Sequence, residues 1–203
     1  MRLQVPQVIR WYYKNVLWHE NPKEKKIYLT FDDGPVPEVT PKVLEILHTY
    51  RAKATFFCVG DNVRKHPETY RQVLNEGHRT GNHTFNHIKG FDCPPEKYVE
   101  NVKKASGCID SKLFRPPHGQ ISQKLIGRLS PLYKIVMWDI ITYDFDQKNS
   151  PENIMKLIRK KSKNGSIVVF HDSLKAKKNL LETLPLALDY WTTKGFQVVS
   201  LEE

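Results

Sequence analysis

The sequence predicts a single folded α/β domain whose parallel strands form a sheet or barrel. Its 203 residues suit one domain with a full hydrophobic core. Hydrophobic residues make up 39% of the chain and charged residues 27%, as in water-soluble globular proteins. Short runs rich in β-branched and aromatic residues alternate with segments of helical periodicity, which is typical of parallel strands joined by helices.

Six runs have the composition of strands, and signals between them mark helices. Thr40 before Pro41 predicts a helix start, because a capping hydroxyl followed by proline is typical of the first turn. Ser150 before Pro151 repeats this pattern, and Gly77 predicts a helix end. The strand candidates are residues 27–32, 54–59, 113–115, 133–140, 166–171 and 196–201, with a weaker seventh that ends near Gly81.

Residues 8–18 (VIRWYYKNVLW) are aromatic and basic, so two locations fit them. They could lie at a membrane surface, but aromatic side chains at helical spacing favour docking on the domain's own core. No run reaches the roughly 18 apolar residues of a membrane-spanning helix, and polar residues interrupt the apolar stretch of a signal peptide. We therefore expect neither segment and, by default, a cytoplasmic location, with a function at the cell envelope left open.

The chain is strongly basic, since 32 Lys and Arg residues against 22 Asp and Glu residues give a net charge of +10. This charge favours acidic partners such as anionic glycans, a membrane surface or nucleic acid, and does not choose among them. The three cysteines include no C-x-x-C pair. A disulfide framework and a thiolate zinc site are therefore not expected.

The first candidate site follows the strand at residues 27–32. There the sequence TFDDGP brings Asp32 and Asp33 to a Gly-Pro turn. In isolation, Asp-Gly can simply form a turn. Two neighbouring acids at a strand end can also divide a task, one as a metal ligand and the other as a base beside the metal.

The second candidate site is the pair His83 and His87. At this spacing two imidazoles share one face of a helical turn and can bind one metal ion. Thr84 stands where H-E-x-x-H proteases carry their glutamate base, so the base must come from elsewhere. Asp32 is the obvious candidate.

Three further motifs lie where strands are expected to end: RPPHG at residues 115–119, WDIITYDF at residues 138–145 and IVVFHD at residues 167–172. Arg115 alone favours a surface ion pair, and Trp138 alone favours a place in the core. His171 ends an apolar strand and could act as a general acid. We expect the remaining histidines to be structural or surface residues: His19, His48, His66 and His78.

Together the five motifs resemble those of the polysaccharide deacetylases of carbohydrate esterase family 4, the NodB-homology domain. TFDDGP, H-T-x-x-H, R-x-P-x-G, an Asp-aromatic element and an apolar-x-x-His element occur in the family's order between residues 25 and 201. The resemblance implies a distorted (β/α) barrel of about seven parallel strands with surrounding helices. It makes residues 25–203 the catalytic domain and residues 1–24 an N-terminal extension, which we expect to be helical and packed on the domain.

The resemblance also implies roles for individual residues. One divalent ion, zinc or else cobalt, nickel, manganese or iron, would be held by Asp33, His83 and His87. Asp32 would be the base that deprotonates the attacking water, and Arg115 would orient it. His171 would protonate the leaving amine, and Asp144 would hold His171.

Five residues correspond to the family's substrate groove: Pro117, His118, Gly119, Phe145 and Val168. His118 replaces a tyrosine whose backbone amide is the implied oxyanion donor, so the donor is kept and the groove wall changes. Phe145 replaces a tryptophan and loses an indole donor. Val168 replaces a leucine in the pocket for the acetyl methyl group.

The leading hypothesis is a metal-dependent hydrolase that removes N-acetyl groups from a glycan containing N-acetylglucosamine, such as peptidoglycan or a chitin-like oligosaccharide. An anionic glycan would suit the charge, and no nucleic-acid partner is expected. Deacetylation or ester cleavage of a small acetylated compound would use the same residues. Two histidines and a carboxylate also fit a non-haem iron oxygenase, which would leave Asp32 and His171 unexplained. A non-catalytic glycan-binding or nucleic-acid-binding module is suggested mainly by the charge.

Overall fold

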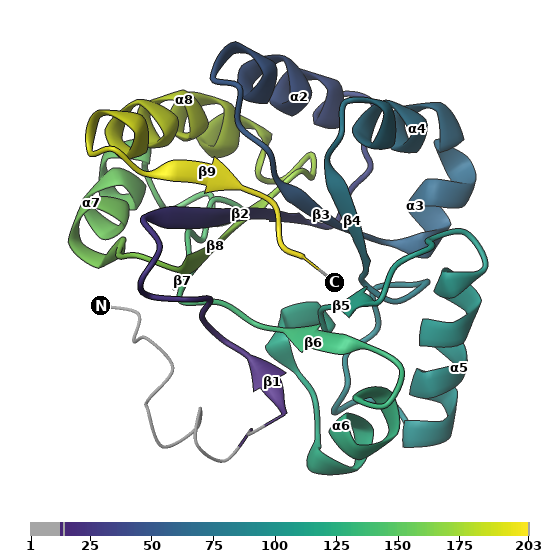
Figure 1. Ribbon diagram of the computed structural model, residues 1–203. Coiled ribbons are helices and arrows are strands. Elements are labelled where there is room, and N and C mark those ends of the chain that lie inside the picture. Colours follow the sequence, from purple (N-terminus) through teal and green to yellow (C-terminus); the bar gives the residue numbers. More distant parts are fainter. Residues whose placement is uncertain (1–12, 14, 203) are drawn as a thin grey trace.

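The computed structural model describes residue 13 and residues 15–202, which form a curled parallel sheet with helices on its outside (Figure 1). The strand order is β1-β6-β5-β4-β3-β2-β8-β7, with β9 also paired to β2. All pairings between the described strands are parallel, which confirms the predicted distorted barrel. The strands are β1 (Val16–Leu17), β2 (Lys26–Asp32), β3 (Thr55–Cys58), β4 (Arg79–Asn82), β5 (Leu113–Phe114), β6 (Lys134–Val136), β7 (Ile140–Ile141), β8 (Ser166–His171) and β9 (Gln197–Val199).

Helices alternate with these strands, and in Figure 1 α7 and α8 lie across the barrel from α5. As predicted, the Ser150 hydroxyl caps α7, where it accepts the Asn153 N–H at 3.3 Å, and Gly77 follows α4 with φ +73°. Thr40 is not a cap but the first residue of α2, because its hydroxyl is engaged elsewhere. The helices are α2 (Thr40–Thr49), α3 (Gly60–Lys65), α4 (Pro67–Asn75), α5 (Pro95–Ser106), α6 (Gln123–Leu129), α7 (Pro151–Lys161) and α8 (Lys177–Thr193), with a 3₁₀ turn η1 (Pro117–Gly119).

Strand β2 lies at the centre of the sheet and carries the first candidate site. Its residues 27–32 pair with β8 on one side, and on the other side β9 and then β3 pair with it. Leu29 and Phe31 pack into the core beneath the outer helices. Because successive strand residues point to opposite faces, Thr30 and Asp32 face the barrel interior. Asp32 is also the last residue of β2, so its side chain lies inside the barrel at its carboxyl end.

The run at residues 133–140, predicted as one strand, is divided into β6 and β7. β6 pairs with β5 and β1, whereas β7 pairs with β8. Because one stretch of chain changes partners between its two halves, it joins the two edges of the curled sheet. The change of partner falls at Met137–Asp139 and leaves Trp138 at the bend.

The described part of the N-terminal extension contains a strand and no helix. Val16 and Trp18 are each 9% exposed and join the core cluster formed with α5 and α6. These two apolar side chains are therefore not available to a membrane surface. Residues 1–12 and 14, which carry the rest of the expected helix and of the aromatic run, lie outside the described residues. Within the described chain, the helices are all too short or too polar to span a bilayer.

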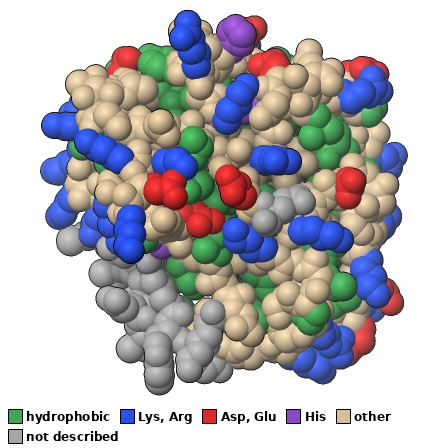
Figure 2. All heavy atoms as spheres, viewed as in Figure 1, with side chains coloured by type: hydrophobic (Ala, Val, Ile, Leu, Met, Phe, Trp, Pro, Cys, Tyr) green, Lys and Arg blue, Asp and Glu red, His purple; other side chains and the backbone are tan. Residues whose placement is uncertain are grey.

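Apolar side chains fill the barrel interior away from the site. Leu201, near the C-terminus, is fully buried there, and its N–H donates to the Thr55 hydroxyl at 2.9 Å. Figure 2 shows that Lys and Arg side chains are scattered over the face where the C-terminus lies, with several acidic side chains near its middle. On this face the positive charge does not gather into one patch.

Candidate active site

Asp32 and Asp33 are adjacent at the end of β2 but face different partners. Asp32 is 4% exposed, and its Oδ1 accepts a 2.6 Å hydrogen bond from Nη1 of Arg115. Arg115 itself is fully buried, and its other nitrogens donate to backbone carbonyls of Val136 and Met137. The suggestion of a surface ion pair is therefore wrong for Arg115, which spans the barrel interior and holds the Asp32 carboxylate in place.

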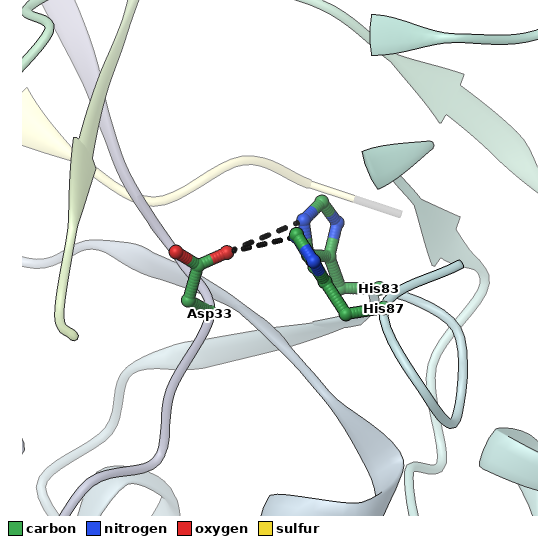
Figure 3. A group of neighbouring side chains, drawn as sticks. All are labelled: Asp33, His83 and His87. Carbon is green, nitrogen blue, oxygen red and sulfur yellow. Dashed lines mark ion pairs between the residues drawn. The ribbon is translucent and has the colours of Figure 1, made fainter. Parts of the chain in front are cut away.

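Asp33 faces two imidazoles, as Figure 3 shows. Its Oδ1 lies 3.1 Å from Nε2 of His87 and 3.8 Å from Nε2 of His83, and the three candidate ligand atoms lie within 4.8 Å of one another. Ligand atoms about 2.0–2.1 Å from one zinc ion are about 3.3 Å apart in tetrahedral geometry, so the group suits a single ion. Nδ1 of His83 donates to the Arg115 carbonyl at 2.7 Å, which leaves Nε2 for a metal.

The electrostatics of this group favour the protonation states that bind metal. Burial acts to raise the pKa of Asp33, but the hydrogen bond from His87 and the charges of His171 and His83 outweigh it, so the pKa lies below its usual value. Burial lowers the pKa of His83 to about 4. At neutral pH the group therefore offers a carboxylate and a neutral imidazole, the forms that act as metal ligands.

The prediction that His83 and His87 share a helical turn is wrong. Residues 83–87 form a loop after β4, in which Thr84 and His87 have left-handed φ values of +64° and +53°. Side chains replace the helical hydrogen bonds, since Asn82 accepts the N–H of Thr84 at 2.9 Å and Asn101 accepts that of Phe85 at 2.8 Å. The tight loop still brings the two imidazole rings to a centroid distance of 5.1 Å.

His171 and Asp144 form the second pair of partners at the site. Asp144 is fully buried, and its two oxygens accept the Nδ1–H of His171 at 2.7 Å and the backbone N–H of His171 at 2.8 Å. Burial alone would lower the pKa of His171, but the charge and hydrogen bond of Asp144 raise it to about 9. The imidazole is therefore protonated at neutral pH, and its Nε2–H remains as a proton donor.

A cavity of about 660 Å³ joins these groups. Seven predicted residues line it, with Arg115 and Asp144 directly behind Asp32 and His171: Asp32, Asp33, His83, His87, His118, Phe145 and His171. Trp138, at the bend between β6 and β7, also lines the cavity. As expected it packs against the core, although it is only partly buried there. No role was predicted for the other lining residues, which are Ile141 and Tyr143 of the motif at residues 138–145, and Ser173 and Lys175 outside the motifs.

Most of the predicted groove residues lie at or beside the cavity, and one of them does not. His118, in η1, is exposed with φ +58°, and its ring centroid lies 4.8 Å from that of His87. Pro117 and Gly119 are not among the cavity-lining residues but shape the turn that carries His118, and a Cβ at Gly119 would lie 2.8 Å from the Trp138 ring. The prediction for Val168 is wrong. Three residues before His171, it faces the opposite side of β8 and is fully buried beneath the outer helices.

Asp172 is a buried acid next to the site. It belongs to the motif at residues 167–172, but no role was predicted for it from the sequence. It directly follows His171, is 1% exposed and contacts the Gly-Pro turn after β2. A second polar residue directly after a histidine at a strand end was the sequence signal that could have indicated a role at the site.

Comparison with known proteins places this arrangement in a family. The family model described as polysaccharide deacetylase matches residues 19–132, more than half of the chain. A peptidoglycan-N-acetylglucosamine deacetylase of Bacillus cereus is 34% identical over 195 residues, which cover 93% of this chain and 92% of that protein. A chitooligosaccharide deacetylase of Azorhizobium caulinodans is 34% identical over 157 residues, which cover 73% and 74%.

Solved structures agree with this comparison. A crystal structure of a peptidoglycan N-acetylglucosamine deacetylase has a TM-score of 0.90 and 28% identity over 97% of this chain and 95% of its own. A Bacillus anthracis pseudoenzyme of the CE4 family has a TM-score of 0.78 and 21% identity, covering 91% of this chain and 66% of its own, a likeness of fold alone. The family model and the relatives together show that the chain belongs to the polysaccharide deacetylase family, and its curated relatives named as deacetylases are hydrolases of carbon-nitrogen bonds other than peptide bonds.

Proposed function

We propose that the protein removes acetyl groups from N-acetylglucosamine residues of peptidoglycan in a metal-dependent hydrolysis. One observation carries the proposal: two adjacent carboxylates have different partners. Asp33 faces two imidazoles, Asp32 faces Arg115, and both acids line one cavity with His171. A metal-ligand group, a base and an acid around one cavity are suited to amide hydrolysis. The relatives named as peptidoglycan deacetylases support this glycan as the substrate.

We infer that Asp33, His83 and His87 hold zinc, because two imidazoles and one carboxylate are a common ligand set of catalytic zinc sites. When bound, a divalent cation supplies a Lewis acid for the acetyl oxygen and lowers the pKa of a water molecule. Three protein ligands would leave coordination positions for the acetyl oxygen and for the oxygen of that water molecule. The loss of activity on chelation and the loss of cation binding by ligand variants are expected whichever divalent ion is native.

Removal of the cation should abolish acetate release, and added zinc should restore it. The double variant His83→Ala with His87→Ala should lose the cation, measured by isothermal titration, because only Asp33 of the proposed ligands remains. His48→Ala, which removes an exposed imidazole from α2, is the matched control and should bind as the unaltered protein does. Full turnover after exhaustive chelation, or undiminished binding by the double variant, would contradict the assignment.

The proton transfers fall to the chain's own side chains. Asp32, held by Arg115, takes a proton from the attacking water as the water oxygen forms a bond to the acetyl carbon. His171, held by Asp144, gives its Nε2 proton to the amine nitrogen as the carbon-nitrogen bond breaks. The products are acetate and the free amino sugar.

His118 stands at the cavity wall beside a proposed metal ligand, and its side chain is inferred to contact the glycan rather than react. His118→Tyr should keep the rate on a small acetylated substrate within about tenfold, because both proton transfers are assigned to other residues. Preference among longer glycans should change. Collapse of the small-substrate rate by ~10²-fold, the size expected for an acid or base, would show a chemical role for His118.

The proposed function is tested by acetate release from a defined panel: peptidoglycan fragments, neutral N-acetylglucosamine oligosaccharides, and small N- and O-acetylated compounds. We expect the highest kcat/KM on peptidoglycan fragments. Turnover confined to small compounds would favour the alternative of a small-molecule deacetylase or esterase. Binding of the glycans without acetate release, by metal-loaded protein, would indicate a non-catalytic module.

A further inference from the structure

We propose that Asp172 is a positioning residue for Asp33: it holds the turn after β2 in the conformation that aims the Asp33 carboxylate at His83 and His87. This inference rests on the proposed metal-binding role of Asp33. Asp172 is 1% exposed, lies just beyond β8 and takes no part in the proton transfers described above.

The Asp172 carboxylate holds the turn through both of its oxygens. Oδ1 accepts the backbone N–H of Gly34 at 3.0 Å, and Oδ2 accepts the hydroxyl of Thr40 at 2.6 Å. The Thr40 oxygen in turn accepts the N–H of Val36 at 2.8 Å. One buried carboxylate therefore fixes two backbone N–H groups of the turn, one directly and one through a hydroxyl.

The peptide group between Asp33 and Gly34 is held from both sides. Its N–H points to Asp172, and its carbonyl oxygen accepts a 2.8 Å hydrogen bond from the side-chain amide of Asn62 in α3. Asp33 has φ +83°, a left-handed conformation that is unfavourable for a residue with a Cβ. Because the plane of this peptide sets ψ of Asp33, the two bonds together fix the direction in which its Cα–Cβ bond leaves the backbone.

Gly34 permits the close approach of the carboxylate. An ideal Cβ at Gly34 would lie 2.0 Å from Oδ2 and 2.5 Å from Cγ of Asp172, distances that no side chain could occupy. The glycine of TFDDGP and the acid after His171 are therefore a matched pair. Their sequence separation of 138 residues explains why neither predicts the other.

The Asp172 side chain interacts with the turn after β2 and not with a cation. Among the residues that the structure describes, no Lys, Arg or His forms an ion pair with its carboxylate. Burial raises the pKa of Asp172, and the hydrogen bonds from Thr40 and Gly34 oppose that rise. Its contacts thus point to a role in holding the backbone.

The test measures cobalt(II) affinity by competition with a chelator, together with the visible spectrum of the bound cobalt. Asp172→Ala should weaken binding at least about tenfold, the lower end expected when support around a metal ligand is lost, and should change the spectrum. Asp172→Asn should stay close to the unaltered protein, because its amide oxygen can accept from Gly34 and its N–H can donate to Thr40. Thr40→Val should weaken binding less than Asp172→Ala, in the same direction.

Asp139→Ala is the matched control. Asp139 is 5% exposed and accepts the N–H of Ile167, at the other end of β8 from Asp172. Its removal deletes a buried carboxylate at comparable depth, so we expect lower thermal stability with unchanged cobalt affinity and spectrum.

Unchanged cobalt binding by folded Asp172→Ala would overturn the proposal, and so would an equal loss in Asp172→Asn, which would indicate charge rather than position. If circular dichroism shows that Asp172→Ala does not fold, Thr40→Val decides, and its unchanged affinity would overturn the proposal. Failure of the proposed function is distinguishable, since it would appear in the unaltered protein as absent cobalt binding or absent acetate release. Absent cobalt binding would overturn this inference as well.

Discussion

Asp32→Asn should lower turnover of an N-acetyl sugar at least ~10²-fold, since a positioned general base contributes about that much or more. The cation should remain bound, because Asp32 faces Arg115 rather than the proposed metal ligands. Acetate release by the metal-loaded variant measures the first effect, and isothermal titration measures the second. Asp110→Asn, at an exposed acid outside the cavity, is the control. Near-normal acetate release would place the base elsewhere.

The same position links activity to stability. Asp32→Ala leaves the buried Arg115 guanidinium without an anionic partner, and breaking a buried pair in this way costs about 3–5 kcal/mol. Asn keeps an acceptor oxygen for Nη1, so Asp32→Asn should unfold at a higher temperature than Asp32→Ala. Thermal unfolding followed by circular dichroism gives the comparison. Equal melting temperatures would show that the ion pair does not govern stability.

His171→Ala should cost ~10²–10⁴-fold on an N-acetyl sugar and far less on an activated aryl acetate. An amine leaves poorly unless protonated, whereas an activated aryl oxide leaves as a stable anion. The ratio of the rate loss on the N-acetyl sugar to the rate loss on the aryl acetate therefore measures proton donation by His171. Equal losses on both substrates would contradict the acid role and point to packing or metal binding by His171.

Asp144→Asn should show the same bias more weakly, with a changed pH profile. The acid form of His171 exists below its pKa, which Asp144 raises to about 9, so turnover that needs this form falls as pH rises through that value. Removing the Asp144 charge lowers the pKa, and the falling limb should move to lower pH. A profile that stays unchanged in Asp144→Asn would separate Asp144 from the titration of His171.

The sequence predicts the central strands well and the closure of the barrel poorly. Residues 27–32 and 166–171 are mostly apolar and are buried throughout, so their composition marks β2 and β8 within one residue of their bounds. The division at residues 137–139 depends on a change of pairing partner, which local composition does not encode. β1 has two residues, too few for a strand pattern to appear.

The candidate site shows the same limit at the level of single residues. The i, i+4 spacing of His83 and His87 predicts a shared site without fixing the backbone, because Asn82 and Asn101 stabilise a loop in place of a helical turn. Val168 is misplaced because alternation along β8, not closeness to His171 in the sequence, decides which face a residue occupies. The role of Asp172 is not predicted because its partner Gly34 lies in the turn after β2, 138 residues away in the sequence.

The central place of β2 has a consequence for the order of events during synthesis. Asp33, His83 and His87 are made in the first half of the chain, but β2 gains its longest pairing only with β8, at residues 166–171. Contacts between such distant segments form slowly, because a long loop must close first. On the ribosome, the emerging chain therefore exposes one unpaired edge of β2 until most of the protein has been translated. Assembly of the site is a late event that awaits the C-terminal third.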